Sequence, residues 1–200
     1  MDITRERWDE AQAAECEDHL VNLANSPDSL YHHGESLVAQ YVGLDLKNDV
    51  KDKFVIEVGA GPKGAILLTG GNFKRGIVVE PLIDKFPPEV RKVYEDMGVE
   101  VVTEMYEDVD YGAVDETWFF NVLQHVISPE KQLQKAKENS DVVRIFEPIN
   151  YPANISHPHV LTKELFTGIF GQDFGSLYVG GSRSDFHTAD CYYGTWIKED

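Results

Sequence analysis

The sequence predicts an α/β fold in which a mostly parallel sheet carries helices on both faces. Short apolar runs that are typical of buried strands alternate with helical patterns along most of the chain. The first run, 54–58, stops at the turn Gly59-Ala60-Gly61-Pro62-Lys63-Gly64, and we expect a helix to open at Gly64. A strand, a glycine turn and a helix start together place backbone N–H groups against a ligand.

The glycine turn does not by itself identify that ligand. Gly59, Gly61 and Gly64 also satisfy the dinucleotide pattern G-x-G-x-x-G. Glu57 adds information, because a carboxylate inside a buried parallel strand is costly without partners. We therefore expect the Glu57 side chain to reach donors, water or a ligand near the carboxyl end of its strand.

About fifty residues precede the glycine turn. Residues 4–25 predict an amphipathic helix with an imperfect apolar stripe that includes Glu15. A second helical pattern runs over 37–44, and a polar linker, 45–53, leads into the first strand. Simple NAD-binding domains usually begin at the glycine turn, so this extension argues for another kind of protein.

The second strand, 76–79, ends in Glu80. This residue follows Gly61 by 19 positions (80 − 61). An acidic residue about 20 positions past the turn, at the end of the second strand, can accept hydrogen bonds from both hydroxyls of a ribose. Glu80 is therefore the second candidate binding residue.

The remaining pattern continues the alternation of strands and helices. Ser128-Pro129 is a good N-cap and first-turn pair, and Pro87 and Pro88 are suited to a helix start. The predicted elements are a helix at 87–95, strands at 99–103 and 117–120, a helix at 130–138, a strand at 141–146, a helix at 163–170, and strands at 176–179 and 191–196.

Two stretches resemble a known family. Glu57-Val58-Gly59-Ala60-Gly61-Pro62-Lys63-Gly64 resembles the first motif of class I S-adenosylmethionine-dependent methyltransferases, acidic-x-Gly-x-Gly-x-Gly, with the last glycine displaced by one position. Leu123-Gln124-His125 resembles the family's Leu-x-His element after the fourth strand. The resemblance covers roughly Tyr31 to the C-terminus.

The resemblance implies a fold and a domain organisation. It implies a Rossmann-like three-layer sandwich with a mostly parallel seven-stranded sheet and a C-terminal antiparallel hairpin. The whole chain, 1–200, would form one methyltransferase-like domain. Within it, 1–45 would be a helical lid and 53–200 the cofactor-binding sheet.

The resemblance also implies S-adenosylmethionine as the cofactor and a set of residues that hold it. The methionine part would lie on Gly59, Gly61 and the backbone near Ala60, with Glu57 orienting its amino group. Glu80, with Pro81 beside it, would bind the ribose. Glu104 and Met105 would contact the adenine, and Asn121 and Leu123 would close the pocket through their backbones.

The chain has seven histidines, and two of them are our candidates for catalysis. His157 and His159 lie in a long polar loop, 150–159, and could act as a general base if the acceptor must lose a proton. The alternative is that they only structure the loop. His125 could touch the cofactor pocket or pack at a helix start. His187 or Asp190 could join the loop histidines around a metal, but the spacing does not demand it, and no metal is predicted.

Composition limits the kinds of molecule that the protein is expected to bind. The formal net charge is −17, which argues against nucleic acid or an anionic membrane as the main partner. Without a separate substrate domain or an obvious basic groove, the acceptor is expected to be a small molecule methylated at O or N. Arg183 could clamp an anionic group of such a molecule.

The sequence also bears on location. The two cysteines lie far apart, and neither a signal-like nor a transmembrane apolar run is evident, so we expect a cytoplasmic protein without a membrane partner. The oligomeric state is open.

Two other functions fit part of the pattern. An NAD-dependent oxidoreductase would explain the glycine spacing and Glu80, but not Glu57 inside the strand, and the chain has no Tyr-x-x-x-Lys of the kind such enzymes use. A cofactor-binding protein of the same fold without turnover is the other alternative, because the displaced glycine leaves room for it and fold alone does not fix function.

Overall fold

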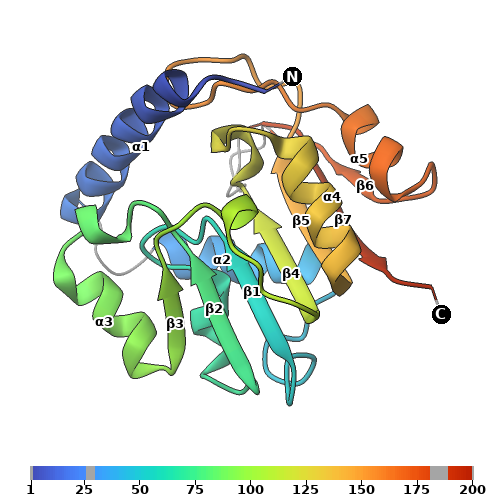
Figure 1. Cartoon of the computed structure of the whole chain (residues 1–200), viewed down its shortest axis with the longest axis horizontal. Coiled ribbons are helices and arrows are strands. Elements are labelled where there is room, and N and C mark those ends of the chain that lie inside the picture. The colour runs from blue at the N-terminus through green and yellow to red at the C-terminus, as the bar shows by residue number, and fades with distance from the viewer. Residues whose placement is uncertain (1, 26–29, 181–188, 200) are drawn as a thin grey trace.

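A computed structural model describes residues 2–25, 30–180 and 189–199, without the side chains of 30–35. Its centre is a seven-stranded sheet with the strand order β3-β2-β1-β4-β5-β7-β6 (Figure 1). β7 is antiparallel to both of its neighbours, and the other pairs are parallel. The strands are β1 Phe54–Val58, β2 Arg75–Val79, β3 Val99–Val102, β4 Val114–Phe120, β5 Ser140–Pro148, β6 Ser176–Tyr178 and β7 Cys191–Ile197.

Helices cover both faces of this sheet, so the predicted three-layer α/β sandwich is confirmed. The residues of β1 alternate between two cores: Val55 packs with α2, α3 and the η1 turn, whereas Ile56 packs with α4 and α5. The α-helices are α1 Arg5–Asn25, α2 Leu30–Tyr41, α3 Pro88–Asp96, α4 Pro129–Asn139 and α5 Lys163–Phe170. The 3₁₀ helices are η1 Ala65–Thr69, η2 Ile83–Lys85, η3 Tyr106–Asp108 and η4 Leu123–His125.

Local sequence signals account for several helix boundaries. Ser128 is the N-cap of α4, where its hydroxyl accepts from the backbone N–H of Lys131 at 3.4 Å. Pro88 is the first residue of α3, and Gly98 follows its end with φ +79°. These boundaries agree with the predicted ones to within one or two residues.

The expected helix after the glycine turn is only a short 3₁₀ helix. Five residues, Ala65–Thr69, form η1, and Gly70 then takes a left-handed conformation with φ +66°. Gly71 follows with φ +76°, so the chain leaves the helical path at once. The long crossover helix typical of this position is absent here, which leaves α2 to cover η1.

The two N-terminal helices have different positions, so 1–45 is not one lid. α1 lies across the carboxyl ends of the strands, whereas α2 packs against the sheet (Figure 1). Val38, Ala39 and Val42 of α2 belong to the buried core. Of these two helices, α1 is therefore the one that can cover a site at the strand ends. None of the described helices is long and apolar enough to span a membrane.

Candidate functional site

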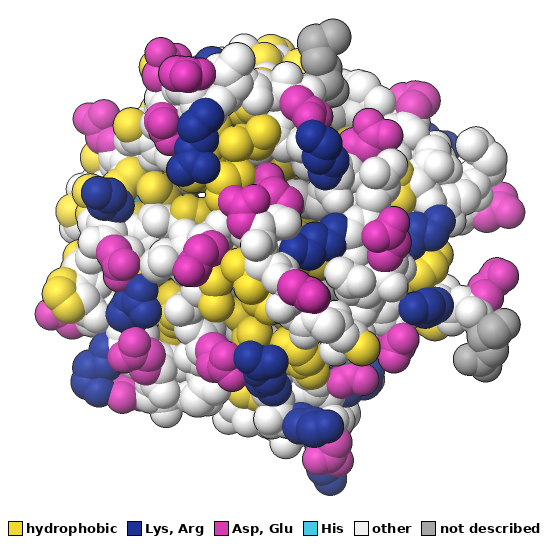
Figure 2. Space-filling model, in the orientation of Figure 1, with side chains coloured by type: hydrophobic (Ala, Val, Ile, Leu, Met, Phe, Trp, Pro, Cys, Tyr) yellow, Lys and Arg dark blue, Asp and Glu magenta, His cyan; other side chains and the backbone are white. Residues whose placement is uncertain are grey.

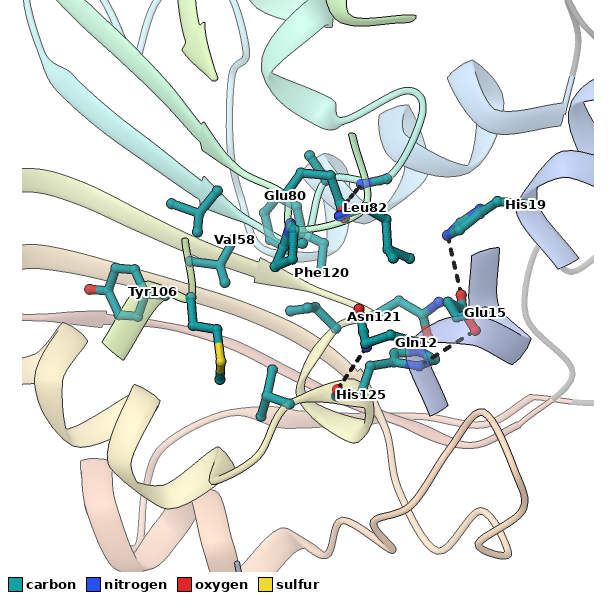
Figure 3. A pocket seen from close by; sticks show the side chains of 18 of the residues that line it. Gln12, Glu15, His19, Val58, Glu80, Leu82, Tyr106, Phe120, Asn121 and His125 are labelled. Atoms are coloured by element: carbon teal, nitrogen blue, oxygen red, sulfur yellow. Dashed lines mark hydrogen bonds and ion pairs between the residues drawn. The ribbon is translucent and has the colours of Figure 1, made fainter. Parts of the chain in front are cut away.

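A cavity of about 870 Å³, counting the part open to solvent, lies under α1 at the carboxyl ends of β1, β2 and β4 (Figure 3). In an open α/β sheet this edge is where ligands bind. Of the predicted cofactor residues, those that line the cavity are Gly59, Ala60, Gly61, Glu80, Pro81, Met105 and Asn121.

Two residues of the glycine turn combine a left-handed conformation with close neighbouring atoms. Gly59 has φ +64°, and a Cβ there would lie 2.0 Å from Cγ2 of Val122. Gly61 has φ +59°, and a Cβ would lie 3.3 Å from the His19 ring. Both residues therefore take a left-handed conformation while bare backbone faces the cavity.

Glu80 joins the ends of the first two strands. Its Oε2 accepts from the backbone N–H of Gly61 at 2.7 Å, and its Oε1 accepts from that of Leu82 at 2.9 Å. Burial raises the pKa of Glu80, and these two hydrogen bonds oppose the rise. A carboxylate has about four acceptor positions, so about two remain for a ligand in the cavity.

Glu57 does not reach the cavity, contrary to the expectation that it would orient an amino group there. Its oxygens accept from the backbone N–H groups of Ala65 at 2.9 Å and Ile66 at 2.8 Å. It thus stabilises the start of η1. A Cβ at Gly64 would lie 2.6 Å from Glu57 Oε2, so the displaced glycine makes room for this carboxylate.

The region beyond Glu80 has one predicted residue in the cavity wall and one outside it. Met105 lines the cavity, but Glu104 is exposed and borders a neighbouring groove. Gln132, which sequence analysis missed, is buried against the same cavity. Its Oε1 has no hydrogen-bond partner among the described residues. An unpaired buried acceptor of this kind fits a ligand N–H group.

After β4 the chain turns sharply at Asn121. This residue has φ +59°, a conformation that asparagine tolerates better than most, and it lines the cavity. Leu123 is buried and does not line the cavity; its N–H and that of Val122 donate to the carboxylate of Glu147. Burial raises the pKa of Glu147 to about 8.

Neither candidate catalytic histidine lines the cavity. His159 is buried, and its Nε2 lies 2.7 Å from the carbonyl oxygen of Val126, which fits the loop-structuring alternative. His157 is half-buried, and its ring centroid lies 4.7 Å from that of His125. His125 itself does line the cavity, which favours the pocket interpretation of that residue over simple packing. Arg183 and His187 lie outside the described residues.

α1 contributes three polar side chains to the cavity that the sequence motifs did not indicate: Gln12, Glu15 and His19. Gln12 donates to the carbonyl oxygen of His125 at 3.2 Å, and His19 Nε2 lies 3.2 Å from Glu15 Oε1 (Figure 3). The available signal was Glu15 itself, a charged residue within the apolar stripe of the first helix.

The face seen in Figure 2 has no large basic area. Lys and Arg side chains are scattered among Asp and Glu side chains, with apolar patches between them. This arrangement differs from the contiguous basic surface that phosphate backbones require.

No protein-family model and no curated protein sequence matches the chain. Solved structures are similar to it in fold. One is the N-methyltransferase NodS from Bradyrhizobium japonicum WM9 with S-adenosyl-L-homocysteine, at a TM-score of 0.61 and 10% identity, covering 94% of this chain and 98% of that one. Another is magnesium protoporphyrin IX methyltransferase (ChlM) from Synechocystis PCC 6803 with bound SAM, at a TM-score of 0.57 and 13% identity, covering 84% and 79%.

The chain thus has the fold of the class I S-adenosylmethionine-dependent methyltransferases, as its sequence motifs predict. A third similar structure shows that this fold does not define one reaction. The [4+2]-cyclase SpnF matches at a TM-score of 0.55 and 13% identity, covering 72% of this chain and 57% of that one. Function therefore has to be argued from the site.

Proposed function

We propose that the protein is an S-adenosylmethionine-dependent methyltransferase that acts on a small-molecule acceptor at O or N. The observation that carries the proposal is Glu80. It is a buried carboxylate in the cavity wall, at the end of β2, and it is hydrogen-bonded to the N–H of Gly61 in the glycine turn. Two structures of the same fold, NodS and ChlM, hold S-adenosylhomocysteine or S-adenosylmethionine.

The cofactor would use the cavity residues in order along the sheet edge. Gly59, Ala60 and Gly61 would carry the methionine part on their backbone, and Glu80 with Pro81 would bind the ribose. Met105 would pack on the adenine ring. We assign its amino group to the unpaired Oε1 of Gln132 rather than to Glu104, because only Gln132 lines the cavity.

The residues present fit such a cofactor chemically. When bound, the cofactor supplies a methyl group on a positively charged sulfur, so the chain has only to hold it and align an acceptor with it. Two carboxylates, Glu15 and Glu80, line the cavity. Their negative charge suits a ligand that carries a sulfonium and an ammonium group.

A small acceptor fits the remaining space better than a macromolecule. The cavity lies under α1, which contributes Trp8, Gln12, Glu15 and His19 to its lining. The chain carries a net charge of −17, which works against nucleic acid. We therefore propose a small organic acceptor.

Calorimetric titration with S-adenosylmethionine, S-adenosylhomocysteine and NAD tests the proposal. We expect micromolar binding of the first two and none of NAD. Glu80→Gln should weaken S-adenosylhomocysteine binding by roughly 10- to 100-fold, because a hydrogen bond to a charged group is worth about 1.5–3 kcal/mol. Glu57→Gln is the matched control, since Glu57 ends the neighbouring strand but faces η1, and its folded form should bind normally.

Other results would contradict the proposal in different ways. Preferential binding of NAD would favour the oxidoreductase. Tight binding of S-adenosylmethionine without methyl transfer across phenols, alcohols, amines and thiols would favour a cofactor-binding protein or another reaction, as SpnF illustrates. Equal loss of affinity in both glutamate variants would mean that Glu80 acts through the fold rather than on the ligand.

A further inference from the structure

Four ionisable side chains from three separate segments meet where α1 crosses η4. Glu15 and His19 belong to α1 and His125 to η4 (Figure 3). His157 belongs to the loop after β5. One ligand-type atom of each of Glu15, His125 and His157 lies within 4.8 Å of the others. Such a cluster can coordinate a cation or form a hydrogen-bonded acid–base network. The positions of the imidazole protons separate these two possibilities.

The proton of His157 is placed by Asn154. The Oδ1 of Asn154 accepts from three donors: the backbone N–H of Ser156 at 3.0 Å, the hydroxyl of Ser156 at 3.1 Å and the backbone N–H of His157 at 2.9 Å. These bonds fix the amide orientation, so Nδ2 must donate to Nδ1 of His157, 2.9 Å away. Neutral His157 therefore carries its proton on Nε2.

The proton of His125 has the opposite position. Its Nδ1 lies 2.9 Å from the carbonyl oxygen of Ser156 and 3.5 Å from Oε2 of Glu15. Both neighbours only accept, so Nδ1 must carry the proton. Nε2 keeps a lone pair and has no hydrogen-bond partner among the described residues. Because His125 lines the cavity, this lone pair is available to a ligand there.

This arrangement disfavours a metal ion. A cation bound through Nε2 of His157 would move the ring proton to Nδ1, directly against the donating amide of Asn154. Turning that amide to relieve the conflict would break its three other hydrogen bonds. The cluster is therefore organised around protons, with the carboxylate of Glu15 as the shared acceptor.

From this geometry we infer, on the basis of the proposed function, that His125 Nε2 is the general base and that the acceptor is a hydroxyl compound. The acceptor oxygen attacks the methyl carbon of the sulfonium, and the carbon–sulfur bond breaks with its electron pair going to sulfur. The hydroxyl proton passes to Nε2 of His125. The resulting imidazolium is stabilised by Glu15 beside Nδ1 and loses its proton to water after the products leave.

The electrostatics of the cluster agree with these roles. Burial lowers the pKa of His125 to about 4, while Glu15 opposes the shift, so the imidazole is neutral near pH 7 and free to take a proton. Burial acts to raise the pKa of Glu15, but the hydrogen bond from His19 and the nearby His125 and His157 outweigh it and bring the pKa to about 2. Glu15 is thus ionised at neutral pH.

A weak base is sufficient for a hydroxyl and not for an aliphatic amine. Methylation of a neutral hydroxyl makes its proton strongly acidic as the new bond forms, so even a weak base removes it. An aliphatic ammonium holds its proton far more tightly and would not release it to His125. The substrate class that this site favours is therefore an alcohol or phenol.

Nitrogen NMR of the full chain with ¹⁵N-labelled histidine, in the presence of S-adenosylhomocysteine, tests the proton positions. Comparison with His125→Gln assigns the signal. We expect His125 to be neutral near pH 7 with its proton on Nδ1, and to be unaffected by added zinc chloride. A proton on Nε2, a charged ring near pH 7, or stoichiometric zinc binding that shifts both His125 and His157 would overturn the inference.

Methyl transfer from radiolabelled S-adenosylmethionine to two probes tests the chemistry. Phenol has a proton to lose, whereas thiophenol is largely ionised at mildly alkaline pH and needs no base. His125→Gln should reduce transfer to phenol by about 10²- to 10⁴-fold and leave transfer to thiophenol and S-adenosylhomocysteine affinity nearly unchanged. Glu15→Gln should show the same selectivity with a smaller loss.

The outcomes distinguish a failure of the general-base inference from a failure of the proposed function. Equal loss for both probes would mean that His125 positions ligands, which overturns the base. If neither probe is methylated, the NMR result still decides the proton positions. Failure of S-adenosylmethionine to bind the wild-type protein would refute the proposed function, whatever the state of His125.

Discussion

The two ends of the cavity are built in different ways. At the end where we propose that the cofactor binds (the cofactor end), the turn at Gly59 and the carboxylate of Glu80 lie 21 positions apart (80 − 59) and belong to neighbouring strands. At the end where we propose that the acceptor binds (the acceptor end), Glu15 and His125 lie 110 positions apart (125 − 15) and meet only because α1 crosses the sheet edge. The first end depends on backbone geometry, and the second depends on the docking of one helix.

The backbone under both ends is nevertheless stabilised by the same kind of hydrogen bonding. A buried glutamate at the end of a strand accepts two backbone N–H groups at the start of a 3₁₀ turn. Glu57 does this for η1 under the cofactor end, and Glu147 does it for the turn that leads to His125. The difference between the ends therefore lies in what faces the ligand, not in what supports it.

The largest expected effect comes from filling the cofactor end. Gly59→Ala adds a methyl group 2.0 Å from Val122 in a left-handed conformation. The strain and the overlap together should lower the free energy of unfolding by about 2–5 kcal/mol and abolish S-adenosylhomocysteine binding. Urea unfolding and calorimetry measure the two effects.

Gly70→Ala is the matched control for this change. Gly70 has φ +66°, almost that of Gly59, but a Cβ there would have nothing within 4 Å. It should lose only about 1–2 kcal/mol from the left-handed conformation and should still bind. Equal losses in the two variants would contradict the claim that close approach, rather than φ alone, requires glycine at 59.

A second prediction concerns the support under the acceptor end. The folded-state pKa of Glu147, about 8, is above that of an unfolded glutamate, so the folded protein holds the proton that the unfolded chain releases. The free energy of unfolding should therefore fall as pH rises between about 5 and 8, by up to about 1.4 kcal/mol per pH unit from this group.

Glu147→Gln cannot titrate and should remove this part of the pH dependence, although its amide offers only one acceptor oxygen to the two N–H donors. Urea unfolding at several pH values should show that wild type loses more stability than the variant between about pH 5 and 8. A wild-type protein whose stability falls no more than that of the variant over this range would mean that Glu147 is ionised and held by its two N–H donors.

The cofactor end was largely predictable from sequence, and the reason is topological. In a parallel sheet the ends of adjacent strands meet, so the positions of Gly61 and Glu80 follow from strand length and connection alone. The same reasoning failed for Glu57, because a side chain in a strand points to either face of the sheet, and this one faces η1. The length of η1 was also missed, since tandem glycines end it early.

The acceptor end was not predictable in the same way. His157 and His159 share a loop and a residue type, yet only His157 lies beside His125, while His159 turns to Val126. Which of the two histidines contacts His125 depends on the conformation of the loop, and short-range sequence patterns do not encode this conformation. The role of α1 depends on its rotation about its own axis, and the apolar stripe that sets the rotation is imperfect. Glu15 in that stripe was the only indication.

The variant with the smallest expected effect tests whether the docking of α1 organises the acceptor end of the cavity alone. Arg7 donates to the carbonyl oxygens of Asn154 at 2.6 Å and Ile155 at 2.8 Å, next to the loop segment that orients His157. Arg7→Ala should reduce the free energy of unfolding by about 0.5–1.5 kcal/mol. Backbone amides of 154–157 should exchange hydrogen faster, because local opening depends on such contacts.

The affinity for S-adenosylhomocysteine should stay the same in Arg7→Ala, since the variant leaves the glycine turn and Glu80 intact. Arg91→Ala is the matched control, because Arg91 makes its hydrogen bonds to Asp84 on the surface, away from the loop, and should leave exchange at 154–157 unaltered. Lower cofactor affinity without faster exchange at 154–157 would contradict the claim that α1 organises the acceptor end. It would mean that the docking of α1 organises the cofactor end, and that the two ends are coupled through this helix rather than built independently.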